Sequence, residues 1–278
     1  MTKHVMTLRE AAERLGVHYM TAYRYVRTGR LPATREGAEW RVRASDVERL
    51  YAREAKPSQR SAPRRAARSN LEQCLVAGDE AGAWAVVEGS LAAGASPEEV
   101  HLALLAPSLA SIGTRWERGR LSVADEHRAT AVAQRLVGRL GPRFARRGRK
   151  RGTVVLGAVA GDTHALPGAI LADLLRGRGF DVVDLGADTP AESFVDAARH
   201  ANRLVAVLVG ATTSGQERVV KRTVTLLHAA DLASPVLVGG FGVDDEEHAR
   251  SLGADGWTGH DGERACAVVE LMAAARVA

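Results

Sequence analysis

The sequence predicts a protein of three parts: a winged helix-turn-helix, then a helical bundle, then a doubly wound, flavodoxin-like parallel α/β sheet. Three observations predict this order. The first part has two short helical patterns and a basic hairpin, the middle has helical apolar spacing throughout, and apolar strands alternate with helices from Thr153 onward. We place the domains at residues 1–54, 71–148 and 149–278, with a basic flexible linker at 55–70.

The charge of the chain is unevenly distributed. Residues 1–70 contain 16 Lys/Arg and 7 Asp/Glu, whereas the remaining residues contain 22 and 26. A basic excess at one end is typical of a nucleic-acid-binding module. The chain has no apolar stretch of membrane-spanning length and no signal-peptide core, so we expect a cytoplasmic protein without a membrane partner. Its two cysteines, Cys74 and Cys266, lie far apart, which suits a reducing compartment.

The first part predicts a DNA-binding domain. Thr7 and Glu10 form a capping box at the start of one helix, Gly16 permits a turn, and a second helix is expected at about residues 19–28. A hairpin follows with Gly37 near its tip. The second helix fits the major groove of DNA, and the arginines of the hairpin can reach phosphates or the minor groove. We expect these side chains to contact double-stranded DNA: Tyr19, Tyr23, Arg24, Arg27, Arg41 and Arg43.

Two stretches of the first part, "TLREAAERLGVHYMTAYRYVRTGRLPA" and "EWRVRASDVERL", resemble the excisionase-like and MerR-like winged helix domains. The resemblance covers about fifty residues and also implies DNA binding. A small helical protein-interaction domain with a solvated basic face is the alternative.

The middle part predicts a bundle of about four antiparallel helices with short connections. One helix opens with Ser96 as its cap, Pro97 in its first turn and Glu99 as the box partner of the cap. Another starts at Ser122 and ends at Gly141. The basic run "RFARRGRKRG" predicts a second linker.

The third part predicts a parallel sheet of about five strands, at "TVVLGAVA", "DVVDLGA", "LVAVLVGAT", "PVLVGGFG" and, more weakly, "GADGWTG". Ligands of such sheets bind beyond the carboxyl ends of the strands, and the stretch "GDTHALPG" directly follows the first strand.

Neither a dinucleotide-type G-x-G-x-x-G nor a phosphate P-loop is present in this stretch. The stretch offers Asp162 two residues before His164, a pair that suits a metal-ligating imidazole held by a carboxylate. Because one histidine cannot hold a bare ion, the metal has to bring its other ligands, as cobalt does in a corrin ring.

The sequence "GDTHALPGAILADLLRGRGFDVVDLGADTP" resembles the cobalamin-binding domain of methionine synthases, corrinoid proteins and mutases. The resemblance covers the whole third part. It implies that His164 is the lower axial ligand of cobalt, that Asp162 is its hydrogen-bond partner, and that Gly239 and Gly240 admit the nucleotide tail of the cofactor. A surface histidine on a nonbinding flavodoxin-like domain is the alternative.

Two positions depart from the pattern of the cobalamin-binding domains. The family has a glycine three places after the histidine, where this chain has Pro167, with Gly168 one place later. The Ser-x-Leu of the family corresponds here to residues 210–212, so we expect Thr212 or Thr213 to supply the hydroxyl group.

The middle part contains "RWERGRLSVADEH", in which Trp116 precedes the pair Glu126–His127. The pattern resembles the helical cap of CarH-type adenosylcobalamin photoreceptors, and the order of the three parts is that of CarH-type regulators. By this resemblance Trp116, Glu126 and His127 line the upper face of the corrin, around the adenosyl group. Light-responsive relatives have a histidine directly after the tryptophan, whereas this chain has Glu117.

Together these resemblances imply a transcription regulator that binds adenosylcobalamin and DNA, responds to light, and has no enzymatic turnover. They also imply a homo-oligomer in the dark, a tetramer by family resemblance. A light-independent sensor of cobalamin level, a regulator that binds another small molecule, and a corrinoid protein of methyl transfer or mutase chemistry are the alternatives. The last is disfavoured because the chain has no barrel-sized catalytic domain.

Overall fold

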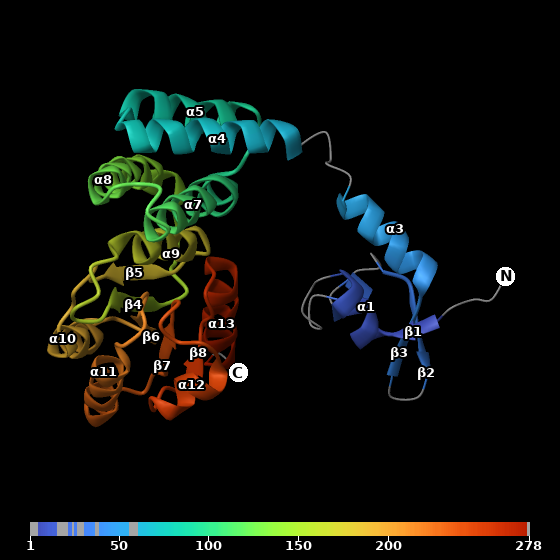
Figure 1. The fold of residues 1–278 in the computed structure, drawn as a ribbon. Helices are drawn as coiled ribbons and strands as arrows, with labels where there is room; N and C mark the ends of the chain where they lie inside the picture. Colours follow the sequence, from blue (N-terminus) through green and yellow to red (C-terminus); the bar gives the residue numbers. More distant parts are fainter. Residues whose placement is uncertain are drawn as a thin grey trace. The chain divides into compact units, whose positions relative to one another are not determined.

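The computed structural model describes residues 5–15, 22–23, 25–26, 31–36, 39–55 and 61–276. The chain divides into two compact units, Met1–Ala66 and Ala67–Ala278 (Figure 1). Among the described helices, none is long and apolar enough to cross a membrane.

The first unit contains a three-stranded antiparallel sheet in the order β1-β3-β2. Its described elements are β1 (Val5–Thr7), α1 (Leu8–Leu15), β2 (Ala33–Glu36), β3 (Glu39–Arg43) and α3 (Ala44–Ala55). The predicted capping box is present, because the Glu10 amide donates to Thr7 Oγ1 at 3.2 Å and the Thr7 amide donates to Glu10 Oε2 at 2.7 Å. The predicted hairpin is β2–β3. Strand β1 was not predicted, since three residues are too few to show an alternating pattern.

The predicted DNA-contacting residues are only partly described. Tyr19, Arg24 and Arg27 lie outside the described residues. Tyr23 is half-buried and packs edge-on against Trp40, with 6.5 Å between ring centroids. On β3, Arg43 is exposed and Arg41 is half-buried. The contacts of these side chains with DNA stay a prediction.

The second unit begins with the predicted helical bundle. Its helices are α4 (Ser61–Ala77), α5 (Glu80–Ala92), α6 (Pro97–Val100), the π-helical turn η1 (His101–Leu105), α7 (Ala106–Glu117), α8 (Val123–Leu140) and the short 3₁₀ turn η2 (Gly141–Phe144). Because α6, η1 and α7 follow one another without a break, the bundle has four long helical segments. Both predicted starts are correct, since Ser96 and Ser122 each cap a helix with a reciprocal box partner.

One part of the predicted linker is helical. The sequence predicts a flexible linker at residues 55–70, but residues 61–70 form the first half of α4. Their alanines and arginines have high helix propensity, and the apolar half of the same helix buries Leu71 and Leu75 in the bundle. Packing of the second half therefore extends the helix into a stretch that lacks an apolar pattern of its own.

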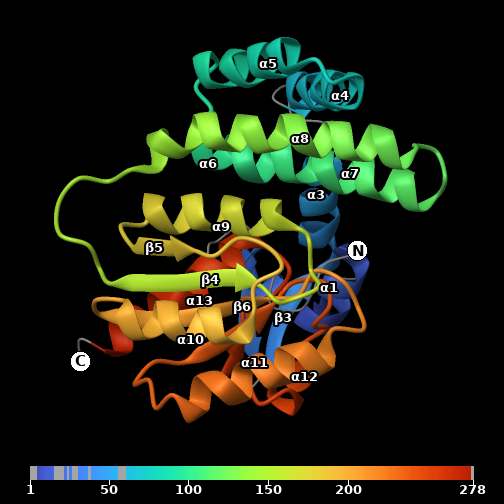
Figure 2. The ribbon, with the colours of Figure 1, turned by 90° about the vertical axis from the view of Figure 1, so that its left-hand side faces the viewer.

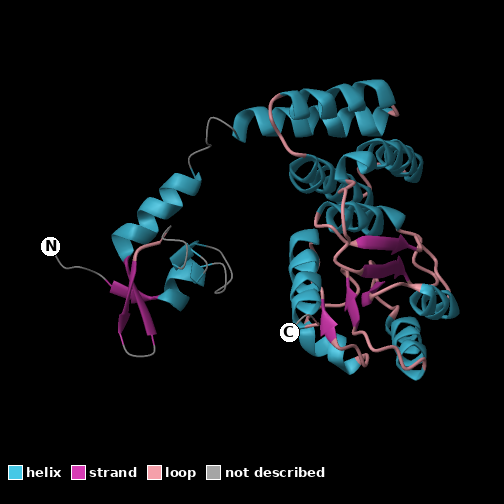
Figure 3. Cartoon of the chain, turned by 180° about the vertical axis from the view of Figure 1, so that it is seen from behind, coloured by secondary structure: helices cyan, strands magenta, loops and turns pink. Residues whose placement is uncertain are grey.

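The rest of the second unit is the predicted five-stranded parallel sheet, in the order β5-β4-β6-β7-β8. The strands are β4 (Thr153–Ala158), β5 (Asp181–Asp184), β6 (Leu204–Gly210), β7 (Val236–Gly239) and β8 (Gly256–Trp257). One apolar cluster contains α9 (Ala165–Gly177) and α13 (Gly262–Ala275), and another contains α10 (Ala191–His200), α11 (Glu217–Ala229) and α12 (Glu246–Ser251). The sheet therefore has helices on both faces, as Figure 3 shows.

The bundle packs on the α9 side of the sheet. The cluster that contains α9 and α13 also contains bundle residues, including Leu105, Leu136 and Leu140. Figure 2 shows the layers in order: α8 and α7 lie above α9, α9 lies above β4, and α10 lies below. The bundle thus covers the helical layer of the α/β domain that contains α9.

A buried polar contact joins the bundle to the α/β domain. His101 is fully buried, and its Nε2 lies 3.0 Å from Asp173 Oδ2 on α9. The imidazole stacks on Phe144, with 4.8 Å between ring centroids, and Arg176 donates to the other carboxylate oxygen of Asp173. This contact lies in the C-terminal half of α9, at the far end of that helix from His164. No sequence pattern indicated it, because residues 101 and 173 are distant in the chain.

A second polar contact lies at the same end of α9. Arg178, at the C-cap of α9, donates to Glu98 Oε1 of α6 at 2.9 Å. Because Glu98 and His101 are one turn apart on the same helical segment, the two contacts together fasten the start of that segment to the end of α9.

Candidate functional site

The candidate site lies where the strand order reverses. In the order β5-β4-β6, the chain leaves β4 toward one edge of the sheet and crosses to the other side for β6. Loops that follow two such strands diverge and leave room for a ligand at their carboxyl ends. Asp162 and His164 lie in the loop after β4, and Thr212 lies just after β6.

Asp162 is the centre of a hydrogen-bonded group. Its side chain is buried, and it accepts from the Thr212 amide at 2.6 Å and from the Thr212 hydroxyl at 2.8 Å. It also accepts from the His164 amide at 3.1 Å, and its Oδ1 lies 2.8 Å from His164 Nδ1. Of the two threonines expected from the sequence, Thr212 is therefore the one that joins this group, and it contacts Asp162 and His164 Nδ1.

The surroundings of Asp162 favour its ionised form. Burial acts to raise the pKa of the carboxyl group, but the hydrogen bonds from Thr212 and His164 together lower this pKa below its ordinary value. The group is therefore a carboxylate at neutral pH, and a carboxylate next to Nδ1 favours the imidazole tautomer that carries its proton on Nδ1. That tautomer leaves the lone pair on Nε2.

The geometry of His164 fits a metal that brings most of its own ligands. The side chain is 55% exposed, so the ring is accessible although Nδ1 is occupied by Asp162. In the part of the chain that the structure describes, no group of three His, Cys, Asp or Glu side chains could hold a bare ion. One oriented imidazole nitrogen would fit a cobalt ion whose other ligands come from a corrin ring.

Pro167 occupies a position where proline costs little. It is the third residue of α9, in the first turn, where amide groups have no partner within the helix. The helix therefore loses no hydrogen bond to the missing amide of proline. The departure from the glycine of the family is compatible with the loop that holds His164.

The three predicted cap residues lie at the ends of two bundle helices. Trp116 is in the last turn of α7 and is 44% exposed. Glu126 is in the first turn of α8, where its carboxylate lies 2.9 Å from His127 Nδ1 and accepts from the Thr130 hydroxyl at 2.8 Å. Figure 2 shows the α7–α8 connection and the loop after β4 at the same end of the unit. The contact of these three side chains with a cofactor stays a prediction.

Packing within the protein is a second reason for glycine at positions 239 and 240, besides the predicted contact with the cofactor. A Cβ atom on Gly239 would lie 1.9 Å from Thr258 Oγ1, and one on Gly240 would lie 2.3 Å from the Ala211 carbonyl oxygen. Gly240 also has a φ of +101°, which L side chains rarely adopt. The packing of the protein alone therefore requires both glycines, and their contact with the nucleotide tail stays a prediction.

Replacing Gly240 with alanine is expected to lower the free energy of unfolding by about 2 kcal/mol or more without cobalamin present, because strain and a backbone clash combine. Gly161→Ala is the matched control, since Gly161 has a φ of +87° but a Cβ atom added there would meet nothing within 4 Å. That variant should lose only about 1 kcal/mol. Urea unfolding of both apo variants makes the comparison, and equal losses would contradict the packing requirement.

An exposed ring pair beside the two glycines was not predicted. Phe241 is 71% exposed and stacks on His260, with 5.1 Å between ring centroids, and Trp257 contacts His260 edge-on. Phe241 directly follows the two glycines in the sequence. The position of Phe241 directly after the two glycines was the one feature of the sequence that could have indicated this ring contact. Its partner, His260, follows β8 and is distant in the sequence.

Comparison with known families agrees with this geometry. Two models described as B12 binding domains match residues 67–140 and 152–269, and a model described as a helix-turn-helix domain matches residues 5–55. The first two cover the bundle and the α/β domain, and the third covers the first unit.

Individual relatives are corrinoid proteins. The chain is 31% identical over 188 residues to a dimethylamine corrinoid protein of Methanosarcina barkeri, which covers 64% of this chain and 84% of the relative. It is 29% identical over 200 residues to a corrinoid protein of Desulfitobacterium hafniense, covering 67% and 88%. The solved monomethylamine corrinoid protein of Methanosarcina barkeri has the same fold, with a TM-score of 0.62, 21% identity, and coverage of 72% of this chain and 96% of the other.

The bundle over the doubly wound sheet, with one imidazole at the switch point, is the part of the chain that the two B12-binding models match. The chain belongs to the B12-binding corrinoid protein family. It is a cobalamin-binding protein that also carries a helix-turn-helix domain.

Proposed function

We propose that the protein is a DNA-binding transcription regulator of the CarH type, controlled by adenosylcobalamin and by light. The observation that supports this proposal most strongly is that one chain combines the predicted cofactor-contacting residues with a helix-turn-helix domain. The connection between α7, which ends near Trp116, and α8, which begins near Glu126 and His127, lies at the same end of the unit as the loop after β4. A helix-turn-helix domain precedes them in the sequence. In this function the protein has no turnover of its own.

Each site residue has a separate task in this proposal. His164 Nε2 would hold the cobalt, Asp162 fixes the imidazole tautomer, and Thr212 holds the carboxylate in place. Trp116, Glu126 and His127 would contact the adenosyl group of the cofactor. When bound, adenosylcobalamin supplies a cobalt–carbon bond that visible light breaks.

Assembly links the cofactor to DNA in this proposal. An oligomer carries several helix-turn-helix domains, which raises their effective concentration at neighbouring DNA sites without any new base contact. Cofactor and light control DNA binding only if they favour the assembled and dispersed forms differently. A change in the surroundings of Trp116, on the exposed end of α7, supplies such a difference.

The test is reconstitution with adenosylcobalamin in darkness, followed by light scattering and DNA-shift assays before and after green light. We expect a larger mass and tighter DNA binding in darkness, and loss of both after illumination. A spectral change with constant mass and constant DNA retention would contradict control by light. It would favour a sensor of cobalamin level, which Glu117 in place of histidine also favours.

A methyl-carrying function is the second candidate, because relatives are named as methylamine corrinoid proteins. It predicts that DNA affinity is the same for the apo-protein and for the forms loaded with methylcobalamin or adenosylcobalamin. The same DNA-shift assay with the three forms distinguishes the two functions. A difference between the apo and loaded forms would contradict a carrier role alone.

A further inference from the structure

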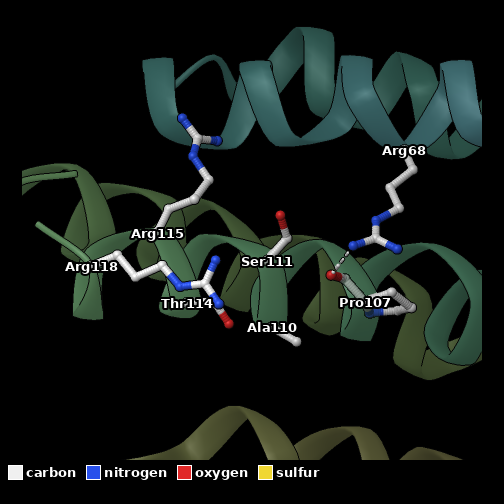
Figure 4. A pocket seen from close by; sticks show the side chains of 7 residues that line it. All are labelled: Arg68, Pro107, Ala110, Ser111, Thr114, Arg115 and Arg118. Carbon is white, nitrogen blue, oxygen red and sulfur yellow. Dashed lines mark hydrogen bonds between the residues drawn. The ribbon is translucent and has the colours of Figure 1, made fainter. Parts of the chain in front are cut away.

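A basic groove lies between α4 and α7, outside the candidate cobalamin site. Its volume is about 450 Å³, and Figure 4 shows its lining side chains. Three of them are arginines, Arg68 from α4 and Arg115 and Arg118 from the end of α7, and two carry hydroxyl groups, Ser111 and Thr114. The groove therefore presents hydrogen-bond donors from two separate helices.

Only one of the three arginines is neutralised by a carboxylate. Arg68 donates to Glu72 at 3.0 Å and to the Pro107 carbonyl at 2.8 Å, and the Ser111 hydroxyl also donates to Glu72 at 3.0 Å. Neither Arg115 nor Arg118 has a side-chain partner among the residues that the structure describes. The groove thus has a net positive charge, with two guanidinium groups whose donors are available.

This positive charge is local. The second unit as a whole has 23 Lys/Arg and 26 Asp/Glu, so its average charge would not attract an anion. Arginines at a helix C-terminus also stabilise the helix dipole, which accounts for one cation at the end of α7. It does not account for the second arginine at this helix end, and both arginines line the groove.

We propose that this groove binds a phosphodiester group of the DNA that the helix-turn-helix domain engages, and this inference rests on the proposed function. The planar N–H forks of arginine match phosphate oxygens, and hydroxyl groups such as that of Thr114 are common partners of the DNA backbone. Exposed Thr114 and Arg118 leave the groove open to solvent, which suits one segment of a long polymer.

The groove and the helix-turn-helix domain belong to one chain. Helix α3 ends at Ala55 and α4 begins at Ser61, and an extended chain spans at most ~3.5 Å per residue. The covalent connection between these two helix ends therefore spans at most about 21 Å.

The position of the two arginines also links the proposed phosphate contact to the proposed cofactor site. Arg115 and Arg118 flank Trp116 on the same helix end, and successive residues of a helix point to different sides. The end of α7 therefore presents Trp116 on a different side from the two arginines that line the groove. Any displacement of this helix end that follows a change of cofactor alters the phosphate contact as well.

The test compares the full-length double variant R115Q/R118Q with wild type and with R199Q/R218Q. The control removes the same charge from exposed arginines of α10 and α11, which have no side-chain partner among the described residues. Affinity for a labelled 40-base-pair duplex is measured at several salt concentrations with holo-protein in darkness. We expect R115Q/R118Q to lower the slope of log K against log salt by about 0.9 for each phosphate that the variant no longer neutralises, and to weaken binding about 10-fold at low salt.

The outcomes separate this inference from the proposed function. If wild type does not bind the duplex, both fail. If wild type binds and R115Q/R118Q has the slope of wild type or of the control, this inference alone is overturned. An unchanged slope with a changed mass in light scattering would assign the groove to a second copy of the chain, which also overturns it. An unchanged absorption spectrum of the cobalamin-loaded variant confirms that the second unit is folded.

Discussion

Replacing His164 with alanine is expected to change the absorption spectrum of bound cobalamin and to weaken cobalamin binding about 10- to 100-fold. The physical reason is the arrangement around the imidazole. Asp162 occupies Nδ1 at 2.8 Å, the side chain is 55% exposed, and Nε2 is the nitrogen left for a ligand. Removing the ring removes that nitrogen while the buried carboxylate keeps its hydrogen bonds from Thr212. Titration with cobalamin, followed by absorption spectroscopy, measures both effects.

Three further variants test the hydrogen bonds that orient His164. Asp162→Asn keeps the shape of the side chain but removes the negative charge, so the tautomer of His164 is held less firmly and binding should weaken about 10-fold. Thr212→Ser keeps the hydroxyl group that donates to Asp162 and should behave like wild type, whereas Thr212→Val should not. Unchanged cofactor uptake and spectrum in His164→Ala would show that His164 does not ligate cobalt.

The second large effect is expected away from the site. Asp173→Ala should lower the free energy of unfolding of the second unit by about 3 kcal/mol, because it leaves the fully buried His101 without its partner. The Nδ1 atom of His101 already has no hydrogen-bond partner among the described residues, so the imidazole would then be wholly unsatisfied. His101→Leu should cost less, since Arg176 still satisfies Asp173.

Urea unfolding of the apo-protein, followed by circular dichroism, measures this decrease. Asp196→Ala is the matched control, because Asp196 also lies near a histidine, His200, but its side chain is 77% exposed. Exposed pairs of this kind contribute at most about 1 kcal/mol. If Asp173→Ala were no less stable than the control, the buried contact would not be what holds the bundle to the α/β domain.

The sequence predicted the larger elements because their patterns are long. The alternation of apolar strands and helices after Thr153 was sufficient to predict a five-stranded parallel sheet, and two serine capping boxes were sufficient to place two bundle helices. Short or context-dependent elements were missed. Strand β1 has three residues, and residues 61–70 are helical because the apolar half of α4 packs in the bundle.

The candidate site was partly predictable for a similar reason. Asp162 and His164 are neighbours in one loop, so the sequence alone paired them, and the hydroxyl groups just after β6 left two threonines as candidates. Only the structure decides for Thr212, because the choice depends on how two loops meet. Trp116, Glu126 and His127 were selected by resemblance, since no local pattern distinguishes them from ordinary bundle residues.

The polar contacts of Glu98 and His101 lie at one end of a continuous helical segment, and Trp116 lies near the other. At about 1.5 Å per residue, roughly 27 Å separates Glu98 from Trp116. Glu98 and His101 hold one end of this segment in place, whereas Trp116 near the other end is exposed. If the segment turned as a rigid body by about 10° about the fixed end, the indole would move by nearly 5 Å, whereas the buried imidazole would scarcely move.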